Sequence, residues 1–574
     1  MKNSYWNRPL LVLLAAAFLL AACKETTEPS EPVLEVVPRQ GITLIRNARI
    51  YTFDAASSWL DNGSMAFSEH GTIEGLGDAE AMLQAFPGAQ VIDLGGKTVI
   101  PGLIDSHAHL AGLAQSFTRA NLVGAKSKAE VLDRLREFER ELSEGDWLLG
   151  RGWDQNDWPE QAFPNRHDLD AAFPDRAVWL RRIDGHAGWA NSRAIAEADR
   201  DLSGDWQEQG GFIHRDEQGQ ATGIFIDKAM NTIEMAVPPD SPELMDKALD
   251  LATRAMVSQG LTGVHEAGTS LDLLQLYRKK IAAGAMPIRI YAMADGMNAA
   301  LDWLCENGPF DDPSGRLLMR SVKLYADGAL GSRGAALLQD YSDDPGNQGL
   351  MFMQAQTIDD NLRRILACGL QVGTHTIGDR ANREMLDALE RVIPEFSDNP
   401  GRHRLEHAQI LDSADIPRFA ELDVIAAMQP THATSDMYWA DERLGDSRIL
   451  GAYAWQSLVR SGARLALGSD FPVEAVNPML GIHAAVTRQD LEGWPEGGWL
   501  PQESLSREQA IRGFTIDAAY AGFMEDRIGS LETGKKADFI VLEKDIMQVP
   551  PEEIPILKVE QTWVDGKQVY VNSP

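Results

Sequence analysis

Two histidines two residues apart, His107 and His109, follow an apolar run that begins at Val99. In an extended strand, residues two apart point to the same face, so both imidazole rings would lie side by side. Two neutral imidazoles on one face can bind one divalent metal ion. An isolated pair of this kind is more often a set of core or surface histidines, so the interpretation depends on the rest of the chain.

Four later segments each carry a residue that can bind metal at or near the end of an apolar run. They contain Lys323 (Ser-Val-Lys-Leu-Tyr), His375 (Gly-Thr-His-Thr), His407 (Arg-Leu-Glu-His) and Asp470 (Gly-Ser-Asp-Phe-Pro). If the apolar runs are parallel strands of one barrel, their carboxyl ends open at the same mouth. Six potential ligands would then converge there, which packing alone does not explain.

The elements that must position these residues alternate between strand and helix patterns, which is typical of parallel βα units. Eight such units predict a (β/α)8 barrel, also called a TIM barrel, with its active site where the strands end. The expected strands are Val99–Ile104, Gly260–His265, Ile288–Met293, Val322–Tyr325, Gln371–His375, Arg404–Glu406, Val424–Met428 and Arg464–Gly468.

The barrel is expected to span residues 104–529, with an α/β subdomain inserted at about 145–240. An insertion at this face of a barrel usually shapes substrate access, and the alternative is a purely stabilising excursion. Alternating strand patterns at the two chain ends, residues 41–103 and 530–574, predict one discontinuous β-sandwich around the barrel.

The N-terminus is predicted to be a secretory signal, because Lys2 and Arg8 precede a short apolar stretch. The segment that ends at Cys23 resembles a bacterial lipoprotein cleavage box, which implies removal of residues 1–22 and a lipid on Cys23. A plain signal with a chance cysteine is the alternative. Residues 23–40 resemble a flexible tether, and Lys24 favours the outer membrane, facing the periplasm.

The composition argues for a large globular protein without a nucleic-acid partner. The chain has 574 residues and a net charge of −32, and its acidic residues are spread along the sequence. Nucleic-acid binding requires a basic face instead. Besides Cys23 the chain has only Cys305 and Cys368, which we expect to be buried free thiols rather than zinc ligands. The oligomeric state stays open, a homodimer included.

Together these motifs resemble the amidohydrolase superfamily of metal-dependent hydrolases. More narrowly they resemble the amidohydrolase_3 (YtcJ-like) family, which includes N-substituted formamide deformylases. The His-x-His segment and Gly-Ser-Asp-Phe-Pro carry the resemblance, supported by Gly152-Trp-Asp154, Arg182-x-Asp-Gly-His186, the Lys323 segment and Gln429-Pro-Thr-His432. The resemblance covers nearly the whole chain after the signal.

The resemblance implies one or two divalent ions, with zinc expected. His107, His109 and Asp470 would hold one ion, and His375 and His407 a second. In the superfamily, a lysine at the position of Lys323 often becomes a carbamate, which could bridge two cations. The alternative is an ordinary ammonium that pairs with Asp327 or a substrate carboxylate, which would leave one ion.

The expected reaction is hydrolysis of a non-peptide carbon–nitrogen bond in a small amide, formamide or cyclic amide, with Asp470 as general acid and base. An ester, a lactone or an N-acyl-amino acid could be cleaved at the same site. A non-catalytic ligand-binding lipoprotein is a third hypothesis. His265 and Glu266 are expected to support the site rather than line the pocket. The candidate substrate contacts are Trp153, Arg182, His186, Arg333 and His432. The alternative for Arg182 and His186 is a buried polar network, and tryptophans are more often core residues.

Overall fold

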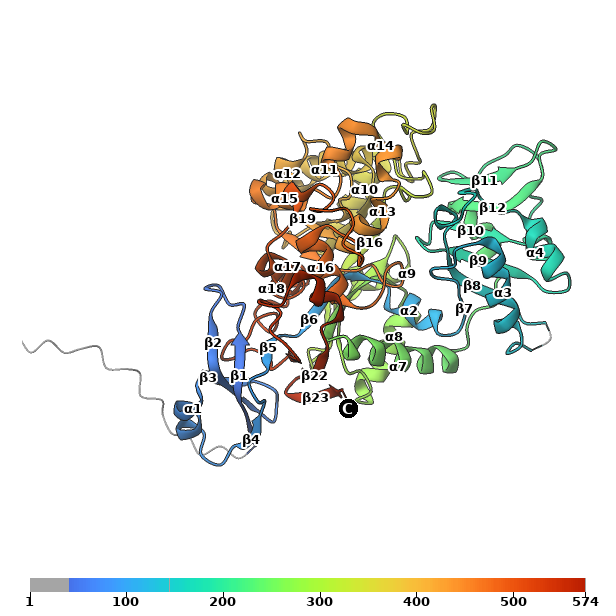
Figure 1. The fold of residues 1–574 in the computed structure, drawn as a ribbon. Coiled ribbons are helices and arrows are strands. Elements are labelled where there is room, and N and C mark those ends of the chain that lie inside the picture. The colour runs from blue at the N-terminus through green and yellow to red at the C-terminus, as the bar shows by residue number, and fades with distance from the viewer. Residues whose placement is uncertain (1–40, 144, 573–574) are drawn as a thin grey trace, which may run out of the picture.

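A computed structural model describes residues 41–143 and 145–572. The predicted signal peptide (1–22), the lipidation site Cys23 and the tether (23–40) lie outside the described residues. The described chain forms three β-sheets, which belong to the two chain ends, the barrel and the insertion. Figure 1 shows the barrel in the middle, with the N-terminal strands and the insertion on opposite sides of it. Within these ranges, no helix has the length and apolar character that crossing a membrane requires.

The central sheet is the predicted barrel. Its eight parallel strands lie in the order β20-β19-β18-β17-β16-β14-β13-β6, with the short β15 (Phe310–Asp311) added to β16. Where β20 ends, the Asp470 amide donates to the His107 carbonyl at 2.7 Å and the His109 amide donates to the Phe471 carbonyl at 2.8 Å, which brings the last strand against the first. The strands are β6 (Leu103–Ala108), β13 (Leu261–Thr269), β14 (Arg289–Asp295), β16 (Leu317–Tyr325), β17 (Gln371–Thr376), β18 (Arg404–His407), β19 (Ile425–Met428) and β20 (Leu465–Leu467).

Helices follow the strands as the alternating pattern predicts, and their apolar faces pack on the outside of the barrel. In α11, for example, Ala381, Met385 and Leu389 are fully buried, whereas Glu390 on the other face is exposed. The helices are α2 (Leu110–Ser116), α7 (Pro242–Ser258), α8 (Leu271–Ala282), α9 (Ala299–Asn307), α10 (Ala355–Ala367), α11 (Asp379–Val392), α12 (Ile416–Glu421), α13 (Pro430–Asp436), α14 (Ala440–Arg448), α15 (Trp455–Ser461), α16 (Pro478–Thr487), α17 (Arg507–Gly513) and α18 (Ile516–Ala521).

The first barrel strand differs from the prediction. The apolar run expected as one strand is divided between β5 (Thr98–Pro101), which belongs to the terminal sheet, and β6, which belongs to the barrel. Gly102 joins them, and a Cβ atom there would lie 2.3 Å from the Thr262 side chain. Both sheets bury apolar residues, so the sequence pattern does not reveal where the chain passes from one to the other.

The two chain ends pair as predicted, through antiparallel contacts between β5 and β21. The sheet order is β23-β22-β21-β5-β1-β2-β3, with β4 beside β1. Phe67 of β2 nevertheless contacts Phe539 of β21 and Trp563 of β22, each at a centroid distance of 5.8 Å, so the sheet curls around its own core. Its elements are β1 (Ile42–Tyr51), β2 (Trp59–Ser68), β3 (Ile73–Asp78), α1 (Ala79–Ala85), β4 (Gln90–Asp93), β5, β21 (Phe539–Leu542), β22 (Val559–Val564) and β23 (Lys567–Val571).

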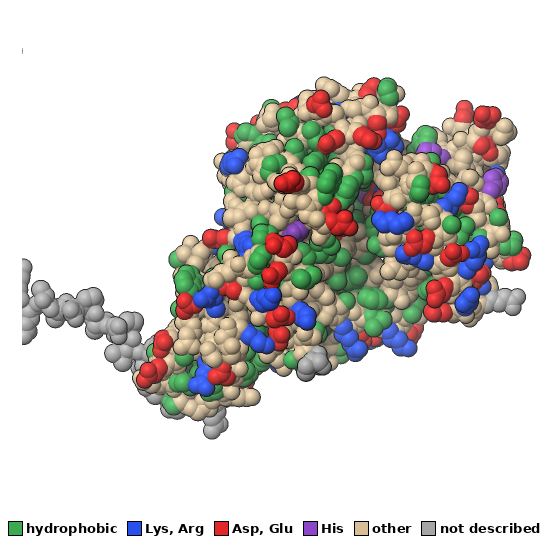
Figure 2. All heavy atoms as spheres, in the orientation of Figure 1, with side chains coloured by type: hydrophobic (Ala, Val, Ile, Leu, Met, Phe, Trp, Pro, Cys, Tyr) green, Lys and Arg blue, Asp and Glu red, His purple; other side chains and the backbone are tan. Residues whose placement is uncertain are grey.

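The insertion has its own six-stranded sheet, in the order β11-β12-β10-β9-β8-β7. This sheet begins at Ala120, before the boundary expected near residue 145. Figure 2 shows the insertion as a lobe beside the barrel. Its elements are β7 (Ala120–Asn121), α3 (Lys128–Glu139), β8 (Leu148–Trp153), α4 (Arg166–Ala172), β9 (Val178–Arg182), β10 (Ala187–Ala190), α5 (Ser192–Ala196), β11 (Gly211–Arg215), β12 (Ala221–Asp227) and α6 (Asn231–Glu234).

The expectation of two buried free thiols is wrong. Cys305, in the last turn of α9, and Cys368, directly after α10, form a disulfide with a Cα–Cα distance of 5.0 Å. Both residues are only partly buried. They are 63 residues apart in the sequence, and the packing of consecutive barrel helices brings them together, which composition alone does not indicate.

Candidate metal centre and active site

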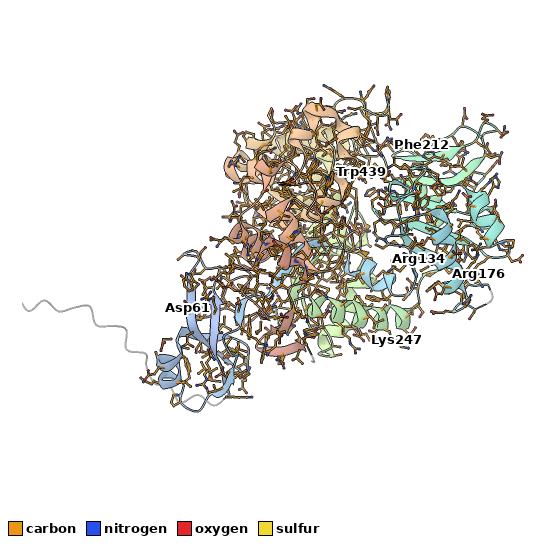
Figure 3. All side chains as sticks on the ribbon, in the orientation of Figure 1. Asp61, Arg134, Arg176, Phe212, Lys247 and Trp439 are labelled. Atoms are coloured by element: carbon orange, nitrogen blue, oxygen red, sulfur yellow. A yellow bond between two sulfur atoms is a disulfide. The ribbon has the colours of Figure 1, made fainter. Side chains whose placement is uncertain are left out.

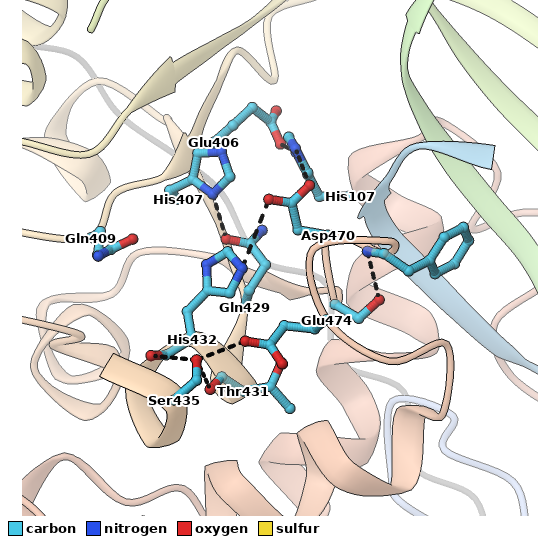
Figure 4. A network of polar contacts seen from close by, with 12 residues as sticks. His107, Glu406, His407, Gln409, Gln429, Thr431, His432, Ser435, Asp470 and Glu474 are labelled. Carbon is cyan, nitrogen blue, oxygen red and sulfur yellow. Dashed lines mark hydrogen bonds and ion pairs between the residues drawn. The ribbon is translucent and has the colours of Figure 1, made fainter. Parts of the chain in front are cut away.

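The two histidines at the end of the first barrel strand meet the aspartate that follows the last strand. The Nε2 atom of His109 lies 3.3 Å from Oδ1 of Asp470, and Nε2 of His107 lies 3.6 Å from the same oxygen. Figure 4 shows His107 and Asp470 side by side at this edge of the barrel. Residues more than 360 positions apart therefore face one point, because the barrel brings its first and last strands together.

The other three predicted ligands surround the same point. The ring centroid of His407 lies 4.8 Å from that of His107 and 4.6 Å from that of His375. Nζ of Lys323 lies 3.4 Å from Nε2 of His107. The ligand atoms of His107, His407 and Asp470 all lie within 4.8 Å of one another, so this trio could hold a metal ion.

Backbone conformation helps to aim two of these side chains. Along a strand successive side chains alternate between faces, so Glu406 and His407 would normally point in opposite directions. His407 instead has a φ of +73°, and Asp470 a φ of +62°. Left-handed conformations are uncommon for residues other than glycine and often mark functional sites. At His407 the turn lets both Glu406 and the imidazole reach the inside of the barrel mouth.

Neighbouring side chains hold the imidazole rings in defined orientations. Nδ1 of His107 lies 2.5 Å from a carboxylate oxygen of Glu406, and Nδ1 of His407 lies 2.8 Å from Oε1 of Gln429 (Figure 4). Each ring thus donates from Nδ1, which leaves the lone pair of Nε2 for another partner. Such contacts orient histidine ligands in metal sites. Neither Glu406 nor Gln429 was predicted from the sequence as a site residue.

A buried cation accompanies Glu406. Arg404, two residues earlier on β18, is fully buried and donates to Glu406 at 2.8 Å and to the Ser106 carbonyl at 2.6 Å. Its other terminal nitrogen lies 2.7 Å from Nδ1 of His265. The sequence signal for this network was the pair of opposite charges, Arg404 and Glu406, in one short strand of the predicted barrel. Buried charges are rare unless they are paired, so two opposite charges there indicate a buried ion pair.

Burial sets the charge states of the rings. It holds the pKa values of His107, His375 and His407 well below the usual histidine value, so these imidazoles are neutral at pH 7. Burial also lowers the pKa of Lys323. Burial alone would raise the pKa of Asp470, but its contact with His109 and the electrostatic effect of the neighbouring histidines outweigh burial and lower that pKa. Neutral rings beside an ionised carboxylate are suitable ligands for zinc.

Two predicted supporting residues do support the site. His265 contacts Arg404 as described, and the buried Glu266 accepts the backbone N–H groups of Leu110 and Ala111, the second at 3.2 Å. These amides open helix α2 directly after His109 and have no partner within the helix. Glu266 thereby fixes the backbone that carries the second histidine of the pair.

The alternative partner proposed for Lys323 is engaged elsewhere. The carboxylate of Asp327 accepts backbone N–H groups from Ala336, Ile377 and Gly378 at 2.8–3.0 Å. Lys323 instead lies beside His107, with Nζ also 4.7 Å from the ring centroid of Tyr325. Asp327 therefore anchors the loop after β16 and does not pair with the lysine.

Of the candidate substrate contacts, His186 and His432 lie at the ligand cluster. The His186 ring centroid is 5.0 Å from that of His375. His432 stacks on His407 at a centroid distance of 5.9 Å, and its Nε2 lies 3.8 Å from Oδ2 of Asp470. His186 comes from the insertion and His432 from α13, so both the insertion and the barrel border the mouth.

The other three candidates have structural partners. Trp153 is fully buried in the insertion, where it packs on Trp158 and Trp189 at centroid distances of 6.0 Å, so its assignment as a substrate contact is corrected to a core role. Arg182 is buried and bonds to Gln155 at 2.8 Å, Asp154 and Asp184. Arg333 pairs with Asp343 at 2.8 Å.

A barrel whose mouth gathers histidines, a lysine and an aspartate defines the class of metal-dependent hydrolases, and sequence comparison agrees. A model of the amidohydrolase family matches residues 90–570. The chain therefore belongs to the amidohydrolase family, and it is a hydrolase that acts on carbon–nitrogen bonds.

Individual relatives match along most of their length. YtcJ of Bacillus subtilis is 34% identical over 89% of this chain and 97% of its own length. An N-substituted formamide deformylase of Arthrobacter pascens is 30% identical over 92% of this chain and 98% of its own. The crystal structure of an uncharacterized metal-dependent hydrolase from Pyrococcus horikoshii is 28% identical, with a TM-score of 0.72 over 89% of this chain and 99% of that one.

Proposed function

We propose that the barrel mouth binds one or two divalent metal ions, with zinc expected. His107, His109 and Asp470 would hold the first ion, and His375 and His407 the second. The donor set fits a metal, because Oδ1 of Asp470 is buried without a hydrogen bond from any residue that the structure describes, while two histidine Nε2 atoms face it within 3.6 Å. A buried carboxylate oxygen without a partner is costly, and a cation would satisfy it.

Two cations need a bridging anion, which we propose to be the carbamate of Lys323. The neutral amine adds to carbon dioxide through a new N–C bond and loses one proton, so the product is an anion with two ligand oxygens. The buried position of Lys323 among His107 and the other predicted ligands supports this assignment. If Lys323 stays an amine at full metal loading, the site holds one ion only.

A bound cation supplies two things, polarisation of the substrate carbonyl and a lower pKa for water, near 7. Asp470 is the group that moves the proton. Its carboxylate is ionised, lies beside His107 and His109, and can take a proton from water and pass it to the leaving nitrogen. A general acid–base group of this kind contributes about 10²–10⁴-fold to the rate.

The proposed substrate is a small amide, formamide or cyclic amide that is not a peptide. The observation that carries the proposal is the convergence of the predicted ligands with an ionised aspartate at one mouth. The relationship to a protein named N-substituted formamide deformylase supports a formamide in particular.

The test compares wild-type enzyme with Asp470→Asn. A panel of N-butylformamide, N-butylacetamide, hydantoin, N-acetylalanine and butyl acetate separates formamide, amide, cyclic amide, acylamino-acid and ester cleavage. We expect one to two zinc-like ions per chain and turnover of at least one amide, which Asp470→Asn lowers by about 10²–10⁴-fold. Full activity in metal-free enzyme, or in the variant, would contradict the mechanism.

We also propose that the chain is exported and held by a lipid on Cys23 at the outer membrane, facing the periplasm. The Cys305–Cys368 disulfide supports export, because disulfides persist in oxidising compartments and are rare in the cytosol. Labelling cells with a radioactive fatty acid should mark the wild-type chain and not Cys23→Ser. Equal labelling of both chains would exclude lipidation at Cys23.

A further inference from the structure

The insertion is docked on the barrel loop that follows β16. Lys228 of the insertion donates to the Phe352 carbonyl at 3.1 Å, and a Cβ atom on Gly331 would lie 3.2 Å from the guanidinium of Arg182. Figure 3 shows Trp439 at the edge of the barrel that faces the insertion, and Phe212 on the insertion itself. The same barrel loop is anchored beside His375 by Asp327, as described above, so the insertion rests on a fixed part of the mouth.

One carboxylate at this junction forms a hydrogen bond through only one of its oxygens within residues 41–143 and 145–572. The Asp227 side chain is completely buried, its Oδ1 lies 2.7 Å from Nδ1 of His186, and its Oδ2 has no hydrogen bond to these residues. Glycines of the barrel loop make room for it, since a Cβ atom on Gly328 or Gly334 would lie 2.5–2.6 Å from Oδ2. The Asp227 backbone is left-handed, with a φ of +51°. The junction is thus built closely around this carboxylate.

The partner of Asp227 points into the mouth. With Nδ1 of His186 committed to the carboxylate, the other ring nitrogen is left for a different partner. The side chain is 18% exposed, although its ring lies 5.0 Å from that of His375. Backbone contacts fix the residue as well, because the His186 amide donates to Asp184 at 3.0 Å and its carbonyl accepts from the Asp227 amide at 2.9 Å.

We propose that the insertion completes the active site with a His186–Asp227 pair, in which His186 hydrogen-bonds the amide substrate through Nε2 and Asp227 is a positioning residue. This inference rests on the proposed hydrolysis of amides at the mouth. It assigns the insertion a direct part in substrate binding rather than a purely stabilising one. It also explains why a buried carboxylate is kept at the junction, where it orients the ring that the substrate meets.

The test uses His186→Gln, Asp227→Asn and the double variant. Binding is measured by calorimetry in the Asp470→Asn background, where turnover is slow, with the panel amide that the wild type cleaves best. We expect each single variant to weaken binding about 10-fold or more, because the hydrogen bond to substrate is lost or misaligned. The double variant should bind no worse than His186→Gln alone, since Asp227 acts only through that ring.

The matched control is His167→Gln, a histidine of the insertion whose side chain is 72% exposed on α4. It should bind the same amide as the parent does. Metal content is measured for every variant and should equal that of the parent, which separates a substrate contact from damage to the metal site.

Three results would overturn the inference. One is unchanged amide binding in His186→Gln. Another is an additive loss in the double variant, which would give Asp227 a structural role of its own. The third is a wild-type enzyme that binds no metal and cleaves no panel amide, which would remove the proposed function along with this inference. In the first two cases an active, metal-loaded wild type leaves the proposed function intact.

Discussion

Replacing Glu406 by glutamine should damage metal binding and stability through separate contacts. In the wild type, one carboxylate serves both Nδ1 of His107 at 2.5 Å and the buried Arg404 at 2.8 Å. The neutral amide leaves Arg404 without its counter-charge, which typically costs about 3–5 kcal/mol of unfolding free energy for a buried pair. It also weakens the hold on the His107 ring, and loss of such a supporting contact typically lowers metal affinity about 10–100-fold.

The assays separate the two effects. Urea unfolding of the metal-free protein measures the stability loss, and competition with a fluorescent zinc chelator measures the affinity. The double variant Arg404→Met with Glu406→Leu removes both charges, so it should recover much of the stability, because a buried ion pair can often be replaced by apolar residues. Its zinc affinity should stay low, since His107 still lacks its acceptor. Wild-type zinc affinity in Glu406→Gln would refute the assigned role of the carboxylate.

Three further predictions concern the junction, the disulfide and the metal. Gly328→Ala puts a Cβ atom 2.5 Å from Oδ2 of Asp227, so limited proteolysis should cut the insertion faster than in the wild type, and unchanged cleavage would argue against close docking. Cys305→Ser opens a 63-residue loop and should lower the unfolding free energy by about 4 kcal/mol, an effect that mild reduction of the wild type must reproduce. Chelation should abolish hydrolysis and zinc should restore it; activity that survives chelation would contradict a metal-dependent reaction.

The sequence predicted the barrel and the converging ligand cluster for a clear physical reason. Parallel strands expose their carboxyl ends at one mouth. Polar residues at the ends of these strands therefore had to meet once the eight strands were recognised, and these residues include His107, His375, His407 and Asp470. The ligand roles themselves remain predictions until the metal is measured. The pairing of the two chain ends was also predictable, because both ends carry short alternating strand patterns of the same kind.

Predictions from the sequence were wrong for features that depend on which residues are neighbours in space. A tryptophan side chain can contact a substrate, but Trp153 packs in the core of the insertion. Cys305 and Cys368 occur in ordinary helical segments, and only the packing of consecutive helices brings their sulfur atoms together. The boundary at Gly102 between the terminal sheet and the barrel could not be predicted, because the apolar run continues through residues that are buried in both sheets.

The sequence by itself thus determined the class of fold and the set of candidate ligand side chains, because both follow from local periodicity and from residue types. Only the tertiary structure decided how those side chains are held. A contact with Glu406 orients the His107 ring, a left-handed backbone orients His407, and Asp227 of the insertion orients the His186 ring. Each of these depends on a contact or a backbone angle that no spacing along the chain encodes.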